Sequence, residues 1–308
     1  MKRMWMGITL IGGALLTSCG ELGDFDPVKE DFHYSYPLQP GGRLELDNKN
    51  GSVDIVGWDR NAIDVSGTKF ASNANRLHEI KINVSVNGNN ASIATERPKD
   101  SWHGSYGAKY MIRVPRQTTL SRAQTTNGSV SVEDLEGGGR VGSTNGRISM
   151  ARDNGDYDLH TTNGAIELEQ CSGSERAHTT NGAVRGRLKA GSIDSESTNG
   201  EIEVTVMRPS DGQPIRASTT NGGIVLAIAE FHNNPVNAHT TNGGVTLRLP
   251  SDTNAKINAE TRVSSISNNL TLSSTDENSK HHLSGQVGKG GPLISATTTT
   301  GGVHLERY

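Results

Sequence analysis

From residue 121 to 308 the chain repeats a short pattern of polar and apolar positions every 18 to 22 residues. Seven copies hold the tripeptide Thr-Asn-Gly, with apolar residues in most of them three and five positions after the Asn and mainly polar residues between. Alternation with a period of two is typical of a strand with one buried face, so we predict a strand after every tripeptide. The Asn-Gly pairs are Asn127-Gly128, Asn145-Gly146, Asn163-Gly164, Asn181-Gly182, Asn199-Gly200, Asn221-Gly222 and Asn242-Gly243.

A second turn and a second strand complete each copy. Ten positions after the Asn, four successive copies carry a glycine, which favours a turn there: Gly137, Gly155, Gly173 and Gly191. Antiparallel hairpins are the usual reading of Asn-Gly, but hairpins do not need the same residue type at the same place in every copy. Stacked parallel coils do. We therefore predict an all-β fold, a β-solenoid resembling a parallel β-helix, with a rise of ~4.8 Å per coil.

We expect the Asn-Gly column to hold the coils together. Glycine can take a positive φ at the bend without steric cost. The Asn side chains are predicted to point inward and to hydrogen-bond from coil to coil, as in other stacked β structures. An inward amide without such a partner costs about 1–3 kcal/mol, so Asn163→Leu or Asn181→Leu should destabilise the fold.

The two ends of the repeat region are less regular. Residues 41–120 contain longer strands and are predicted to form an N-terminal β cap with the first coils, including a hairpin turn at Asn87-Gly88-Asn89-Asn90. At the other end Val263-Ser264 and Thr300-Gly301 take the place of Asn-Gly, so the last two coils are expected to be irregular.

The N-terminus has the features of an export signal. Lys2 and Arg3 precede an apolar stretch from residue 4 to 16 that is too short to span a bilayer. Leu16-Thr17-Ser18-Cys19 resembles a bacterial lipobox; the alternative is an ordinary signal with a chance Cys. We predict a lipoprotein signal peptide at residues 1–18, a lipid on Cys19 that anchors the chain, most simply at the outer membrane, and a tether over residues 19–40.

Composition narrows the possibilities. Apolar residues make up 32% and aromatic residues 4% of the chain, which suits a thin core of small side chains. The net charge of −3 is spread without a basic run, so no nucleic-acid partner is expected. Besides Cys19 the only cysteine is Cys171, which excludes an internal disulfide in the mature chain.

Four features together resemble the "putative adhesin" β-strand repeat family, a domain of unknown function found in bacterial envelopes. They are Gly51-Ser52-Val53-Asp54-Ile55-Val56-Gly57-Trp58-Asp59, Ile112-Arg113-Val114-Pro115, the Thr-Asn-Gly series, and Gly290-Gly291-Pro292-Leu293-Ile294. The resemblance covers about residues 41–308. It implies a β-solenoid in the envelope and no catalytic residues.

Three residue groups are candidates for chemistry. His160, His178 and His239 stand at the same place in their copies, which could bring two of them together at a metal, but an outward solvated column is favoured. The acids of the turn 153–158 lack the spacing of an EF-hand calcium loop. Acid pairs such as Glu167 and Glu169 vary from coil to coil, unlike the fixed pair of a glycosidase. We predict no catalytic residue, no metal and no cofactor.

These inferences give one functional prediction and one alternative. The chain is expected to be a lipid-anchored, monomeric β-solenoid of the cell envelope, a non-catalytic binding, adhesion or structural module whose partner is an envelope protein or a glycan. The alternative is a polysaccharide-active enzyme of the parallel β-helix type, either a lyase or a glycoside hydrolase.

Overall fold

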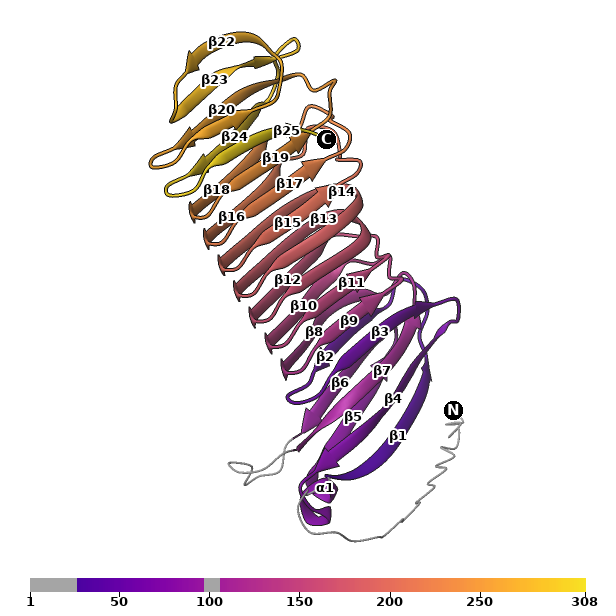
Figure 1. The fold of residues 1–308 in the computed structure, drawn as a ribbon. Coiled ribbons are helices and arrows are strands. Elements are labelled where there is room, and N and C mark those ends of the chain that lie inside the picture. Colours follow the sequence, from indigo (N-terminus) through magenta and orange to yellow (C-terminus); the bar gives the residue numbers. More distant parts are fainter. Residues whose placement is uncertain (1–26, 97–105) are drawn as a thin grey trace.

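The structure is a computed structural model that describes residues 27–96 and 106–308. The predicted signal peptide and Cys19 lie outside these residues. No helix among the described residues is long and apolar enough to cross a membrane. The chain forms an elongated stack of strands, drawn in Figure 1 with its N-terminal part at the bottom.

The described residues form one helix, α1 (Ala74–Glu79), and 25 strands. The strands before the regular repeats are β1 (Val28–Pro37), β2 (Arg43–Asp47), β3 (Val53–Trp58), β4 (Ala62–Ala71), β5 (Lys81–Asn87), β6 (Asn90–Glu96) and β7 (Tyr106–Pro115). The repeats contain β8 (Thr119–Asn127), β9 (Val130–Glu133), β10 (Gly139–Asn145), β11 (Ile148–Ala151), β12 (Tyr157–Asn163), β13 (Ile166–Asn181), β14 (Val184–Asn199), β15 (Ile202–Val206), β16 (Ile215–Asn221), β17 (Ile224–Ile228), β18 (Val236–Asn242) and β19 (Val245–Leu249). The C-terminal strands are β20 (Ala255–Thr261), β21 (Ile266–Asn268), β22 (Leu272–Asn278), β23 (His282–Val287), β24 (Leu293–Thr298) and β25 (Val303–Arg307).

Hydrogen-bonded strands form two rows along the stack. In the repeats the pairing is parallel and in register, so that Ile148 lies beside Ile166 and Asn163 beside Asn181. One row runs β5, β6, β2, β8, β10, β12, the second half of β13, the second half of β14, β16, β18, β24, β20, β23, β22. The other runs β1, β4, β7, β3, β9, β11, the first half of β13, the first half of β14, β15, β17, β19, β25, β21.

The alternation seen in the sequence gives each coil one buried face. In β11, Ile148 and Met150 are buried while Ser149 and Ala151 are half-buried. The buried side chains of both rows form one continuous core along the stack. The chain is therefore all-β with a solenoid-like repeat, as the sequence predicted.

Sequence order and spatial order differ at both ends of the stack. The coil of β2 and β3 lies between β6–β7 and β8–β9. The coil of β24 and β25 likewise lies between β18–β19 and β20–β21. The first and last coils of the sequence are thus each covered by another layer, in which some strands pair antiparallel.

The predicted tether over residues 19–40 is wrong for residues 28–37, which form β1. This strand pairs antiparallel with β4 over its whole length. Its residues Phe32, Tyr34 and Tyr36 alternate with polar ones and pack against the core. The strand was not predicted because charged residues at its start and prolines at its end are more typical of a linker. The hairpin turn predicted at residues 87–90 is confirmed, because β5 and β6 pair antiparallel with Asn87 opposite Asn90.

Leu305 tests whether the last coil is held as an interior coil. It lies in the last strand, β25, and is fully buried between Leu247 and Asn268 of the flanking coils. Leu305→Ala is expected to lower the free energy of unfolding by about 2–5 kcal/mol, the usual cost of a cavity in a core.

The matched control is Glu306→Ala, which removes only the exposed pair with Arg248 and should cost about 0–1 kcal/mol. Chemical unfolding measures both variants. Equal, small effects would show that the last coil is frayed.

Candidate functional site

The Asn side chains of the repeats form a line of hydrogen bonds on the surface. Each Nδ2 donates to Oδ1 of the Asn in the adjoining coil, at 2.7–2.9 Å, from Asn50 to Asn242. At one end Asn50 Nδ2 donates to the carbonyl of Tyr106. At the other the Thr300 hydroxyl lies 3.5 Å from Asn242 Oδ1. Thr300, expected to mark an irregular coil, therefore closes the line with a donor.

These amides face outward, which corrects the predicted inward placement. All seven Asn residues of the tripeptides are exposed. In β12 the alternation buries Thr161 and leaves Thr162 half-buried, and a continued alternation would bury Asn163. The chain bends at Asn163 instead, so the period of two ends one residue early and the amide turns toward solvent.

The interior line is made by hydroxyl groups. The buried Thr161 Oγ1 donates to the carbonyl of Gly146 in the adjoining coil at 2.9 Å, and every regular coil repeats this bond. It satisfies a buried hydroxyl and a turn carbonyl together, which avoids the cost of leaving either unpaired. The donors of these bonds are Thr125, Ser143, Thr161, Thr179, Ser197, Thr219, Thr240, Thr298 and Thr261.

Glycine is needed in the tripeptide because the coils approach closely. This corrects the prediction that glycine is needed there for a positive φ. Gly128, Gly146, Gly164, Gly182 and Gly200 do not have φ values in the left-handed region. A Cβ on Gly164 would instead lie closer than 3.0 Å to the carbonyl oxygen of Gly146, a distance that real Cβ atoms essentially never show. Only a residue without a side chain lets the two turns stack.

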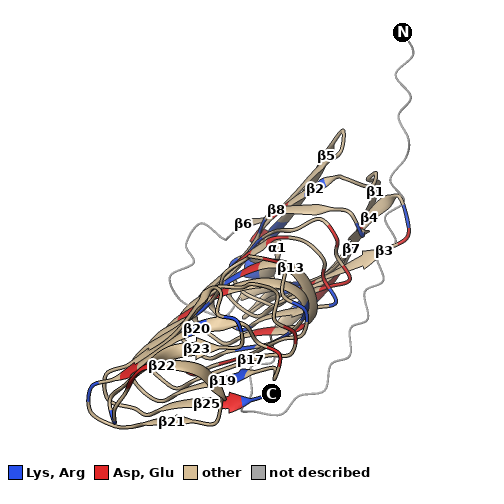
Figure 2. Ribbon diagram, turned by 90° about the horizontal axis from the view of Figure 1, so that it is seen from above, with Lys and Arg blue, Asp and Glu red and all other residues tan. Residues whose placement is uncertain are grey.

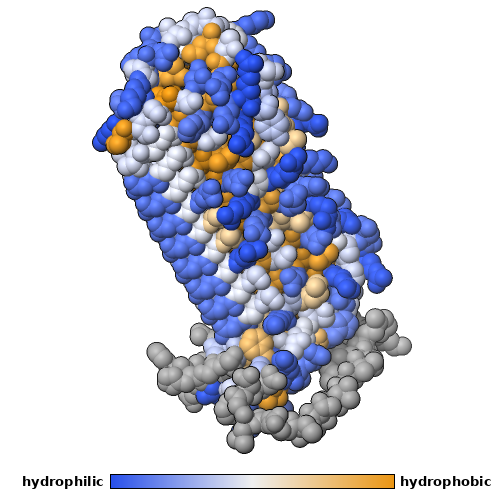
Figure 3. Space-filling model, in the orientation of Figure 1, coloured by the Kyte–Doolittle hydropathy of each residue, from blue (hydrophilic) through white to orange (hydrophobic). Residues whose placement is uncertain are grey.

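The Thr and Asn of the seven tripeptides form a flat surface that we call the Thr-Asn edge. Figure 3 shows it as regular rows along the left side of the stack. An amide has two donors and two acceptor sites, and the ladder uses one of each, so one of each remains for a ligand. The outward Thr hydroxyls make no hydrogen bond within the described part of the chain, and the edge carries no charge. Its residues are Thr126-Asn127, Thr144-Asn145, Thr162-Asn163, Thr180-Asn181, Thr198-Asn199, Thr220-Asn221 and Thr241-Asn242.

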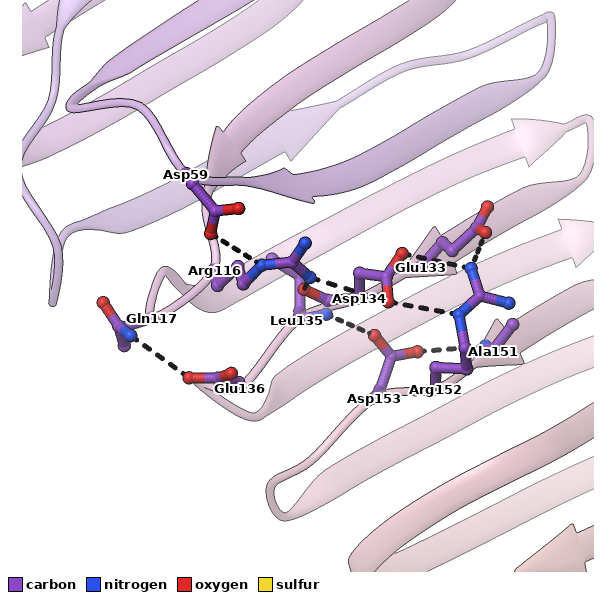
Figure 4. A network of polar contacts seen from close by, with 10 residues as sticks. All are labelled: Asp59, Arg116, Gln117, Glu133, Asp134, Leu135, Glu136, Ala151, Arg152 and Asp153. Carbon is purple, nitrogen blue, oxygen red and sulfur yellow. Dashed lines mark hydrogen bonds and ion pairs between the residues drawn. The ribbon is translucent and has the colours of Figure 1, made fainter.

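Charged residues instead gather in mixed groups elsewhere. Figure 2 shows Lys and Arg interspersed with Asp and Glu. In the largest group, at the second turn, Arg152 binds both oxygens of Asp134 and also Glu133, while Arg116 binds Asp59 and contacts Asp134 (Figure 4). Asp134 and Arg152 both have φ near 60°. The network holds this strained turn in place.

A second group, the acid pocket, is buried inside the coils at the same turn. It consists of Asp153, Tyr157, Cys171 and Glu175, all at most 2% exposed. Asp153 accepts hydrogen bonds from the backbone N–H of Leu135 at 2.7 Å and of Ala151 at 3.1 Å. Neither carboxyl oxygen of Glu175 has a hydrogen-bond partner in the structure.

Burial controls the titration of this pocket. Burial, together with charge repulsion from the neighbouring Asp153 and Asp156, raises the pKa of Glu175 to about 9. Burial raises the pKa of Asp153 to about 7, against the two backbone hydrogen bonds that lower it. Burial also raises the pKa of the Cys171 thiol to about 12, so this thiol is a poor nucleophile.

The other candidates from the sequence are not arranged as reactive sites. The rings of His160 and His178 stack at 5.1 Å, and His178 Nδ1 lies 2.9 Å from Glu196 Oε2 on the exposed surface. His239 bonds to Thr297. Glu167 pairs with Arg147. Within the described ranges there is no group of three or more His, Cys, Asp or Glu residues that could hold a metal ion.

Sequence reasoning missed the inner hydroxyl bonds and the acid pocket. Both could have been predicted by comparing the residues at equivalent positions of successive copies. Six positions before the Asn the successive coils carry Tyr157, Glu175, Ile193 and Ile215, and a single Glu among large apolar residues of an inward column marks a buried acid.

The fold and the edge define a solenoid-like repeat protein with a flat polar surface. The chain belongs to the Toastrack DUF4097 family, whose model matches residues 42–306. This confirms the family resemblance seen in the sequence.

Comparison with other proteins adds distant structural likenesses. No curated protein matches the chain. A "putative adhesin" from Parabacteroides merdae is 9% identical, with 90% of this chain and 96% of that chain covered and a TM-score of 0.45. A "putative adhesin" from Bacteroides fragilis is 12% identical, with 92% and 99% covered and a TM-score of 0.40.

A glycine pair tests the close approach of the turns. Gly164→Ala should lower the free energy of unfolding by about 1–3 kcal/mol, because the new Cβ forces the backbone of adjacent coils apart. Gly142→Ala is the control, since its Cβ would find no atom closer than 3.7 Å. Thermal and urea unfolding compare the two. Equal stability of both variants would contradict the steric role of Gly164.

An Asn pair tests the surface ladder. Asn163→Ala removes two exposed hydrogen bonds, with Asn145 and with Asn181, and should cost about 1–2 kcal/mol because water replaces part of the loss. Asn237→Ala changes an exposed Asn outside the ladder and should have no measurable effect. The difference between their unfolding free energies measures the ladder, and a value near zero would mean that the amides contribute nothing.

Proposed function

We propose that this chain is a non-catalytic binding module of the bacterial cell envelope, which holds an extended ligand along the Thr-Asn edge. The observation that supports this most directly is the edge itself: a flat, uncharged surface on which the same amide and hydroxyl recur in seven coils. Structural neighbours carry the names "putative adhesin" and "putative cell adhesion protein".

The repetition favours a linear polymer as the ligand. A single hydrogen bond contributes only about 0.5–1.5 kcal/mol net, so one coil binds weakly. A linear glycan strand whose sugar repeat is close to the strand spacing of ~4.8 Å can contact several coils in succession. Linked contacts then add up to a useful affinity without a cleft.

A lipid on Cys19 would hold this surface close to a membrane. Val28, the first residue of β1, follows Cys19 by nine positions, which limits the link to about 30 Å even when fully extended. The edge of a short-tethered stack would meet polymers of the envelope layer next to that membrane.

The enzymatic alternative has less support. Glu167 is an outward residue of the sheet face and is paired with Arg147, and the network at the second turn ties up Asp134 and Glu133. The two acids whose pKa values are raised most, Asp153 and Glu175, are buried where no substrate reaches them. A glycosidase needs two facing, accessible carboxyl groups.

Co-sedimentation of the full-length chain with peptidoglycan sacculi and with an insoluble β-1,4-linked glucan tests the proposal. Thr180→Arg places a long cation in the middle of the edge and should weaken binding about fivefold, or about 1 kcal/mol. Ser149→Arg makes the same change on the outward face of β11, in the other row of strands, and should bind like the unchanged chain.

Equal loss in both variants, or no binding to either polymer, would contradict a role for the edge. Release of soluble sugar fragments during the assay would favour the enzymatic alternative.

A further inference from the structure

We propose that the acid pocket is a proton-binding site in the middle of the stack, and that loss of its proton loosens the second-turn ends of the coils that contain β12, β13 and β14. This device goes beyond the binding function proposed above and does not depend on it.

The geometry of Glu175 carries the proposal. The residue lies in β13 and is 1% exposed, and the register places Tyr157 of β12 on one side of it and Ile193 of β14 on the other. Both carboxyl oxygens are buried without a hydrogen-bond partner. An ionised carboxylate in such a place is very costly, whereas a protonated carboxyl is tolerated.

The groups around Glu175 also disfavour its ionised form. The turn that leads into β12 contributes Asp153 and Asp156, both acidic, and β12 contributes the Tyr157 hydroxyl. Cys171 lies earlier in β13, and its thiol pKa is raised partly by Glu175. From β14 the neighbours are Leu188 and Ile193, which are apolar. No Lys, Arg or His acts on Glu175 among the described residues.

The sign of the pH effect follows from these contacts. The pKa of Glu175 is raised from 4.5 to about 9 in the folded chain, so folding takes up a proton between these values. The stabilisation is fully present below about pH 4.5 and is lost as the pH rises through about 9. Asp153, raised to about 7, acts in the same direction over the lower part of this range.

The loosening has a defined place. The turns that cover the pocket stack through Gly155, Gly173 and Gly191, each within backbone contact of the next. A Glu175 carboxylate gains solvation only if these turns separate. The same strands end in Asn163 and Asn181, so the loosened turns and the Thr-Asn edge lie at opposite ends of these strands.

Cys171 is a built-in reporter for the experiment. The thiol is buried in the pocket, so iodoacetamide reaches it only when the coils open. The full-length chain is labelled from pH 5 to 9.5, and mass spectrometry of the peptide with Cys171 gives its rate. Division by the rate for the urea-unfolded chain at each pH removes the titration of the thiol itself and leaves a protection factor.

In the unchanged chain, protection should fall about tenfold per pH unit between about pH 7 and 9, and more steeply below pH 7, where Asp153 also takes part. Glu175→Gln and Glu175→Ile should remove most of this slope and raise protection at pH 8; Ile is the residue of the next coil in the same column. Glu167→Gln, which changes a half-buried carboxylate on the outward face, should behave like the unchanged chain.

Three outcomes would overturn the proposal. They are protection that does not depend on pH, the same slope in both Glu175 variants as in the unchanged chain, and failure of both Glu175 variants to fold. The last would show that the pocket requires a charge, since one variant replaces the acid by a neutral group of the same shape.

Discussion

The close approach of one Gly backbone to the next at the Asn-Gly turn is the constraint on which the stack depends. Successive turns contact through a glycine carbonyl, with no room for a Cβ between them. This contact places Asn163 within hydrogen-bond distance of Asn145 and Asn181, and Thr161 within reach of the Gly146 carbonyl. Threonine, asparagine and glycine therefore act together. The inner hydroxyl donates to the glycine carbonyl, and the outer Asn amides bond to one another because the glycines let the coils approach closely.

The same unit explains how a chain with few apolar residues can form a long ordered stack. The core of each coil is thin, with side chains such as Ile148 and Met150, and it cannot fix the register strongly by itself. Directional hydrogen bonds on both sides of the turn add that register, because a shift by one residue would break the inner and the outer line together. A continuous parallel stack of this kind also satisfies most backbone groups between coils.

The repeats made the coils and their parallel register predictable from the sequence, because the same residue type at the same position of each copy indicates that the copies stack in register. Three parts were not predictable in this way. The direction of Asn163 depends on where the alternation stops at the bend, and β1 has the right alternation but a charged and proline-bounded context. The position of the last coil between β19 and β21 cannot be read from the repeat, because every coil fits equally well beside every other.

The placement of the first and last coils makes the ends of the stack differ from its middle. In a simple solenoid the terminal coils fray first, since each has one neighbour. Here the first and last coils have neighbours on both sides, and the layers outside them contain antiparallel strands. Glu175, a buried acid without a hydrogen-bond partner, lies instead among the central coils. The stack is thus closed at both ends, whereas its central coils contain a buried carboxyl group whose ionisation would be costly.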